Sequence, residues 1–225
     1  MEKEIRSISS EHAEVRLAEP IEGKEMEVSG YGIVFNSLSK DLGGFREIIL
    51  PEAINGVLER SDVLALMNHD TSRGVLARSD KGQGSMTLTI DEIGVRYSFD
   101  APKFSLGEEL VEGIQRGDIK TSSFAFTVAK DGQKVERNKD GSYLRTITQF
   151  ENIYDMSPVY SEAYSDTSVL VRSMEAIATD VIVTPVIEEP ITKVVDEPEV
   201  REHKMDNYER YLYQQHKNYQ IKNKR

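Results

Sequence analysis

The chain of 225 residues contains no cysteine. Disulfide frameworks, thiolate nucleophiles and Cys-ligated metal sites are therefore excluded, and the composition suits a reducing compartment. Long apolar runs are also missing, since the longest are strand-sized and far below the ~20 residues that span a bilayer. The charged start, from Met1 to Ser7, predicts neither a signal peptide nor a membrane anchor. We expect no membrane partner.

Basic residues are also outnumbered, with 28 Lys and Arg against 39 Asp and Glu. The formal net charge of -11 argues against nucleic-acid binding by the chain as a whole. The four histidines show no metal-ligand spacing, and the glycine-rich segments have no P-loop or dinucleotide pattern. We therefore expect no metal, no cofactor and no nucleic-acid partner.

Strand-type patterns dominate residues 25–173, which predicts one α+β domain that is mainly β. Strands are expected at 26–35, 45–50, 63–68, 85–90, 95–100, 123–129 and 143–154, with a break at Ser157-Pro158-Val159. The Gly-Tyr-Gly at 30–32 predicts that the first strand bends or packs closely. A helix is expected from Pro51 to about Arg60. Another is expected to start at a Ser105-x-x-Glu108 capping box and to end at Gly117.

The composition changes beyond residue 173. Residues 174–200 hold seven acidic residues and three prolines against one lysine, which predicts an extended acidic linker. Residues 201–225 are basic and rich in tyrosine, and are expected to form a docking tail. Residues 1–24 are set apart as an N-terminal segment. The linker and tail together are expected to be removable without loss of the domain.

Six short motifs occur in an order and spacing that resemble the prohead (procapsid maturation) proteases of tailed bacteriophages. The likeness covers about residues 25–173, and its motifs are Gly30-Tyr31-Gly32-Ile33-Val34-Phe35-Asn36, Gly44-Phe45-Arg46-Glu47, Asn68-His69-Asp70, Gly117-Asp118-Ile119 through Ser123-Phe124-Ala125-Phe126, Arg145-Thr146-Ile147 and Asp155-Met156-Ser157-Pro158-Val159. The resemblance implies the β-barrel with surrounding helices of herpesvirus assemblin-type serine proteases. It also implies a serine endopeptidase that cleaves capsid and scaffold proteins, and itself, during prohead maturation.

The resemblance further implies where the protein acts and on what. The partners would be the major capsid protein and the scaffold, met inside the assembling prohead in the host cytoplasm. Whether the chain forms a homo-oligomer is left open. The alternative function is a non-catalytic scaffold or capsid-assembly protein that retains the protease fold.

The same resemblance assigns catalytic residues. His69 stands at the family's catalytic histidine, and Ser123, immediately before Phe-x-Phe, stands at its nucleophile. A hydroxyl needs such a base, because it is a poor nucleophile at neutral pH. Asp155 is the candidate third member, and Glu151, four residues earlier, is its rival. Ser122 remains the alternative nucleophile, since neighbouring strand residues point to opposite faces.

Three other polar residues are not expected to take part in catalysis. Asp70, beside His69, is expected to be a turn residue. His203 and His216 lie in the tail and are expected to be exposed to solvent.

Overall fold

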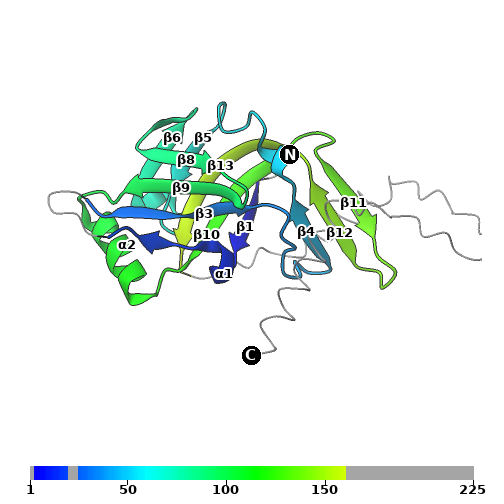
Figure 1. The fold of residues 1–225 in the computed structure, drawn as a ribbon, viewed down its shortest axis with the longest axis horizontal. Coiled ribbons are helices and arrows are strands. Elements are labelled where there is room, and N and C mark those ends of the chain that lie inside the picture. The colour runs from blue at the N-terminus through cyan, green and yellow to red at the C-terminus, as the bar shows by residue number, and fades with distance from the viewer. Residues whose placement is uncertain (1–2, 20–24, 161–225) are drawn as a thin grey trace, which may run out of the picture. The chain divides into compact units, whose positions relative to one another are not determined.

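The computed structural model describes residues 3–19 and 25–160 (Figure 1). The predicted linker at 174–200 and the tail at 201–225, with His203 and His216, lie outside the described residues. No helix in the described ranges is both long and apolar enough to cross a membrane.

Strands make up most of the secondary structure in these ranges, which confirms the mainly β class. The strands are β1 (Glu4–Ile8), β2 (Arg16–Leu17), β3 (Glu27–Val34), β4 (Phe45–Ile49), β5 (Asp62–Ala65), β6 (Ala77–Asp80), β7 (Gln83–Gly84), β8 (Met86–Ile90), β9 (Gly94–Asp100), β10 (Thr121–Val128), β11 (Gln133–Arg137), β12 (Tyr143–Ile147) and β13 (Phe150–Val159). The helices are α1 (Ser10–Ala13) and α2 (Ser105–Arg116), with short 3-10 helices η1 (Pro51–Ile54) and η2 (Thr71–Arg73).

The described strands form three sheets. One has six strands in the order β1-β10-β13-β5-β6-β7, the second is β2-β3-β9-β8, and the third is β11-β12-β4. The pairs β13–β5 and β12–β4 are parallel, and the other pairs are antiparallel. Within the described ranges no sheet closes on itself, so the predicted assemblin-like barrel is not confirmed.

β10 lies between β1 and β13 and supplies the centre of the core. Phe124 and Phe126 point to one face, where their rings stack with centroids 4.9 Å apart and both meet Phe150 edge-on. Ser122 shares this face, and its hydroxyl bonds the buried Tyr97 hydroxyl at 2.8 Å. Because side chains alternate along a strand, Ser123 points to the opposite face.

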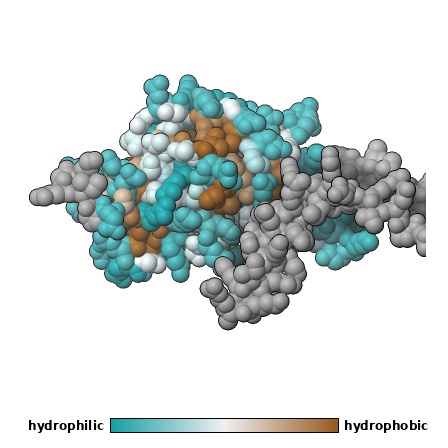
Figure 2. Space-filling model, viewed as in Figure 1, coloured by the Kyte–Doolittle hydropathy of each residue, from teal (hydrophilic) through white to brown (hydrophobic). Residues whose placement is uncertain are grey.

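β3 packs closely against β13, as the Gly-Tyr-Gly segment predicts. A Cβ atom at Gly32 would lie 2.6 Å from the Met156 sulfur, so only glycine fits at this crossing. The register of the β3–β9 pair shifts between Tyr31 and Ile33, which is the predicted bend. On the face seen in Figure 2, hydrophilic side chains form most of the rim and apolar ones gather nearer the middle.

Two predicted helix features are wrong. The helix expected from Pro51 to Arg60 is only the four-residue η1, because Gly56 takes a left-handed φ of 65° and interrupts it. In α2, Ser105 is the first helical residue, and Phe104 precedes it without a side-chain cap. The predicted end of α2 is confirmed, since Gly117 adopts the left-handed conformation at φ 77°.

The strand expected at 143–154 is also wrong, because it divides into β12 and β13. The backbone N–H groups of Thr148 and Gln149 both bond the Gly132 carbonyl and turn the chain. The break expected at Ser157-Pro158-Val159 does not occur, since β13 runs to Val159. Pro158 is tolerated there because the pairing of β13 with β5 is confined to Asp155 and Leu64.

Residues 3–19, which the sequence set apart from the domain, contribute strands to its sheets. β1 forms the edge of the six-stranded sheet, and β2 pairs with β3. β1 is also tied by a buried ion cluster in which Arg6 bonds Glu47 and Arg145 bonds both Glu4 and Glu47. Burial alone would raise the pKa of Glu4, but Arg145 and Arg6 outweigh it and hold the pKa below its ordinary 4.5.

This shift predicts how the stability of the protein depends on pH. A carboxylate with a lowered pKa stabilises the fold above its unfolded pKa, and this contribution is lost as pH falls through the folded value. Glu4→Gln should therefore be less stable than wild type at pH 7, and the difference should shrink as the pH drops below 4.5. Urea unfolding at several pH values measures it. Ser10→Ala, an exposed change in the same segment, is the control, and a difference that is constant with pH would contradict the ion-pair origin.

Candidate active site

Asp155 is buried on β13, on the face of the sheet that carries Ser123. In the register of β10 and β13, Ser123 lies opposite Ser157, and Ala125 lies opposite Asp155. Directly paired residues point to the same face, as do residues two apart on one strand. Ser123, Ser157 and Asp155 therefore share the face opposite the phenylalanine core.

A tight turn after β5 brings His69 to the same place. Asn68 and His69 both adopt the left-handed conformation, with φ of 57° and 61°, which is uncommon outside glycine but best tolerated by residues such as Asn and His. The Asn68 N–H bonds the Pro158 carbonyl at 3.2 Å and ties this turn to β13. The strand expected at 63–68 ends earlier, at Ala65, so His69 lies four residues beyond β5 and not directly after the strand.

His69 and Asp155 form a hydrogen-bonded pair. The imidazole Nδ1 lies 2.5 Å from Asp155 Oδ1. A carboxylate accepts but does not donate, so Nδ1 carries a proton, and in the neutral imidazole the lone pair lies on Nε2. Nε2 is buried and has no hydrogen-bond partner among the described residues. This geometry leaves an oriented imidazole that can take up a proton at Nε2.

Two further side chains contact Asp155. The Ser157 hydroxyl donates to Oδ1 at 2.9 Å and also accepts a hydrogen bond from the buried Leu66 N–H at 3.3 Å. The Lys3 ammonium lies 3.5 Å from Oδ2. Burying a carboxylate is costly unless hydrogen bonds and a counter-charge compensate it. Here Oδ1 accepts the hydrogen bonds and Lys3 supplies the counter-charge, while Oδ2 accepts no hydrogen bond from the described residues.

Ser123 is fully buried, and β1 pairs beside it in the same sheet. Its hydroxyl donates to the Arg6 carbonyl at 2.9 Å, and the Ser7 hydroxyl lies 3.5 Å away. A serine hydroxyl has a single proton to donate. In this structure that proton is therefore directed to β1 and not to His69.

The rival residues lie elsewhere. Ser122 is in the core with Tyr97, whose pKa is raised by burial. Glu151 is exposed, and no hydrogen bond joins its carboxylate to His69 in the described part of the chain. Asp70 accepts from Ser72 at the start of η2, which confirms its turn role. The structure thus brings together His69 and Asp155 on the Ser123 face, and leaves Ser122 and Glu151 apart.

A serine–histidine contact of another kind exists at the surface, between Ser9 and His12. Ser9 Oγ lies 2.9 Å from His12 Nδ1, but the two are exposed and only three residues apart. Among the described residues no carboxylate hydrogen-bonds the His12 ring, so nothing orients it as Asp155 orients His69. Nor does any cluster of three or more His, Asp or Glu side chains in these ranges form a metal-binding group.

A buried carboxylate, an imidazole oriented by it and a serine on the same face are the parts used by acyl-transfer hydrolases of the Ser-His-Asp class. The comparison with protein families agrees with this class. The chain belongs to the caudovirus prohead serine protease family, whose sequence model matches residues 11–180. The resemblance noted from the motifs is confirmed.

The chain was also compared with solved structures and with curated proteins. A solved structure of the capsid assembly protease of bacteriophage T4 is 12% identical, with 71% of this chain and 97% of that chain covered at a TM-score of 0.40. No curated protein matches the sequence.

Some residues of the site were not recognised from the sequence. Ser157 was assigned to a strand break, although it lies within a family motif. Lys3 and the strand β1 that follows it carried no signal, because their contacts with Asp155 and Ser123 depend on pairing across more than a hundred residues.

The role of Ser157 gives a stability prediction. Ser157→Ala removes the acceptor of the buried Leu66 N–H, and an unsatisfied buried donor costs about 1–3 kcal/mol. We expect the free energy of unfolding, measured in urea, to fall by about that amount. Ser10→Ala, a change at an exposed residue, should alter it by less than about 0.5 kcal/mol. Equal effects of the two substitutions would contradict this role of Ser157.

Proposed function

We propose that this chain is a serine endopeptidase that cleaves capsid and scaffold proteins, and itself, during maturation of a phage prohead. The observation that carries the proposal is the His69–Asp155 pair on the sheet face that bears Ser123. Membership of the prohead serine protease family supports the same reaction class. Its place of action would be the assembling prohead in the host cytoplasm.

Each residue has a chemical role in this proposal. Ser123 Oγ attacks the carbonyl carbon of the substrate peptide, and His69 Nε2 takes the hydroxyl proton and passes it to the leaving amine. Asp155 holds the imidazole with its lone pair on Nε2 and stabilises the imidazolium that forms. Water then hydrolyses the acyl-enzyme and restores the serine.

The non-catalytic alternative fits the site less well. A scaffold has no need of a buried carboxylate that orients an imidazole with an open nitrogen, and burying such groups is costly. The barrel architecture of the assemblin-type proteases and the removable role of residues 174–225 remain part of this proposal.

The first test of this function concerns the nucleophile and the base. Ser123→Ala or His69→Ala should lower cleavage of the co-expressed major capsid protein by ~10⁴-fold or more, because such residues act as a unit. Intact-mass analysis of the capsid protein measures the product. Ser122→Ala is the matched control and should retain activity, since its hydroxyl faces Tyr97 in the core. Full activity in both Ser123→Ala and His69→Ala would rule out the serine mechanism.

A second test concerns the acid. Asp155→Asn should lower kcat/KM by about 10²–10⁴-fold, less than His69→Ala, because an amide orients the wrong tautomer while the base remains. Glu151→Gln should leave kcat/KM within about threefold of wild type, since an exposed side chain outside the site contributes little. Circular dichroism of each variant checks the fold. A larger loss in Glu151→Gln than in Asp155→Asn would make Glu151 the third member.

A further inference from the structure

β1 lies on the candidate nucleophile in the manner of a bound peptide. It pairs antiparallel with β10 so that Ser7 lies opposite Ser123, and the Arg6 carbonyl accepts the Ser123 hydroxyl at 2.9 Å. Lys3, just before this strand, reaches Asp155. An extended peptide that adds a strand to a sheet edge is a common mode of peptide recognition. The family match begins at residue 11, so β1 lies outside it.

We propose that the edge of β10 beside Ser123 is the substrate strand site and that Glu47 selects a basic side chain there. In this structure β1 occupies the site as a pseudosubstrate, meaning a segment bound like a substrate but not cleaved. The inference rests on the proposed proteolytic function. The substrate class is an extended peptide with Arg or Lys immediately before the cleaved bond and a small residue after it.

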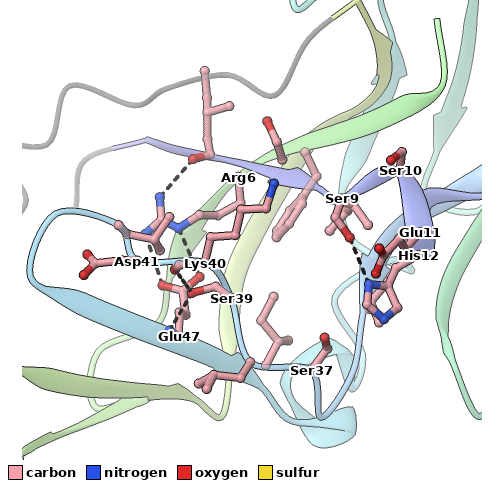
Figure 3. A pocket seen from close by; sticks show the side chains of 18 residues that line it. Arg6, Ser9, Ser10, Glu11, His12, Ser37, Ser39, Lys40, Asp41 and Glu47 are labelled. Atoms are coloured by element: carbon pink, nitrogen blue, oxygen red, sulfur yellow. Dashed lines mark hydrogen bonds and ion pairs between the residues drawn. The ribbon is translucent and has the colours of Figure 1, made fainter. Parts of the chain in front are cut away.

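The side chain of Arg6 shows how the basic residue is recognised. Its Nε and Nη2 atoms each lie 3.1 Å from a carboxylate oxygen of Glu47. The guanidinium also lies over the rings of Phe45 and Phe126, with 5.9 and 5.5 Å to their centroids. Two-point hydrogen bonding is specific to a guanidinium, whereas contact with aromatic faces favours either basic side chain. Figure 3 shows the Arg6 and Glu47 side chains joined by these hydrogen bonds.

Glu47 belongs to the site and not to its occupant. It lies on β4, is only 3% exposed, and is held from the other side by Arg145 at 2.9 Å. If β1 leaves, Arg6 and Glu4 leave with it, whereas Glu47 and Arg145 remain. A buried ion cluster is a weak source of stability, since apolar side chains often replace one without loss. A site that binds the basic side chain of each substrate peptide needs a carboxylate, and this need explains why Glu47 is buried here.

The position after the basic residue requires a small neutral side chain. Ser7 occupies it, and its side chain lies on the face that also carries Ser123 and Asp155. A carboxylate at this position would lie on the sheet face that carries the Asp155 charge, and like charges disfavour binding.

The chain contains a second segment with the pattern of β1. Val171-Arg172-Ser173-Met174 repeats the order of Ile5-Arg6-Ser7-Ile8: a β-branched residue, Arg, Ser and an apolar residue. The likeness stops one residue earlier, where Leu170 stands in place of Glu4. We assign the bond between Arg172 and Ser173 as the substrate that this chain itself supplies.

The other Arg-Ser pairs of the chain do not fit. Arg60-Ser61 and Arg78-Ser79 are each followed by Asp. Both arginines are engaged in the folded domain, since Arg60 bonds the carbonyls of Phe150 and Glu151, and Arg78 pairs with Asp62. Neither pair can enter the strand site without unfolding.

A cavity beside β1 provides room for a longer occupant. Its volume is about 450 Å³, and it is lined by Ile5 to His12, by the loop from Ser37 to Leu42 and by Glu47 (Figure 3). Because β1 and the residues after it line this cavity, the departure of β1 would join the cavity to the strand site.

The cleavage step follows from the proposed mechanism. Ser123 Oγ forms a bond to the carbonyl carbon of Arg172 as the C–N bond to Ser173 breaks. The hydroxyl proton passes through His69 to the Ser173 amine. Water then hydrolyses the ester, which leaves an Arg172 carboxylate and a free Ser123 hydroxyl.

The first experiment follows the intact mass of the full chain with time, with Ser123→Ala as the uncleaved reference. We expect a fragment that ends at Arg172. Arg172→Gln should reduce the rate of its formation by about 10–100-fold, because the charged hydrogen bonds to Glu47 are lost. Arg201→Gln is the matched control and should have no effect. Arg201 also follows a valine, but Glu202 comes after it.

The second experiment tests Glu47 itself with two peptides of residues 168–177, one with Arg172 and one with Gln in its place. In the wild-type protein, kcat/KM should be about 10–100-fold higher for the Arg peptide. Glu47→Gln should bring this ratio close to one, whereas a general loss of fold would lower both values together. Arg46→Gln, an exposed change on the same strand, should leave the ratio unchanged. If Glu47→Gln does not fold, the Arg, Lys and Gln peptides on the wild-type protein decide the preference.

A third variant tests the pseudosubstrate. Arg6→Gln removes the charged contact between β1 and Glu47, so β1 binds the site more weakly. The initial rate of peptide cleavage should therefore rise by about 3–10-fold. An unchanged or lower rate in folded Arg6→Gln overturns the pseudosubstrate role.

The outcomes separate this inference from the proposed function. If neither the chain, the capsid protein nor either peptide is cut in a Ser123-dependent way, the proposed function fails. If Ser123-dependent cleavage occurs only after residues that are not basic, or if the peptide ratio is the same in Glu47→Gln, the function stands and this inference is overturned.

Discussion

β10 pairs with β1 on one side and β13 on the other, and the alternation of its side chains sets the positions of both the core and the site. Phe124 and Phe126 point into the aromatic core, so Ser123 must point to the other face. A register shift of one residue would bury Ser123 among phenylalanines and expel an aromatic ring. The core therefore fixes the orientation of the candidate nucleophile.

The same sheet positions the acid and the base. Asp155 lies two residues from the partner of Ser123, and the strained turn at Asn68 and His69 is tied to β13 by the Pro158 carbonyl. Left-handed conformations at non-glycine residues persist only where the surroundings enforce them, and such strain clusters at functional sites. Ser157 donates a hydrogen bond to Asp155, and Lys3 supplies a counter-charge. Burial, backbone strain and hydrogen bonding thus together fix the orientation of the His69 imidazole.

Four features were predictable, because each rests on local rules of spacing and conformation. They are the strand content, the close crossing at Gly32, the end of α2 at Gly117 and the alternation from Ser122 to Phe126. Predictions failed where tertiary contacts override local preference. Pro158 was taken for a strand end, yet β13 continues through it because no neighbouring strand needs its missing N–H. Residues 1–24 were set apart because nothing local signals that β1 pairs with β10.

By itself, the sequence determined the mainly β class, the prohead protease family and the identity of His69, Ser123 and Asp155 as candidates. These follow from periodicity and from motifs that are contiguous in the chain. Only the tertiary structure decided that Asp155 rather than Glu151 contacts His69, that Ser122 belongs to the core, and that β1 covers Ser123. The reason is physical: strand pairing joins residues far apart in the chain, and its register is set by the packing of the whole core and not by the neighbours of each residue.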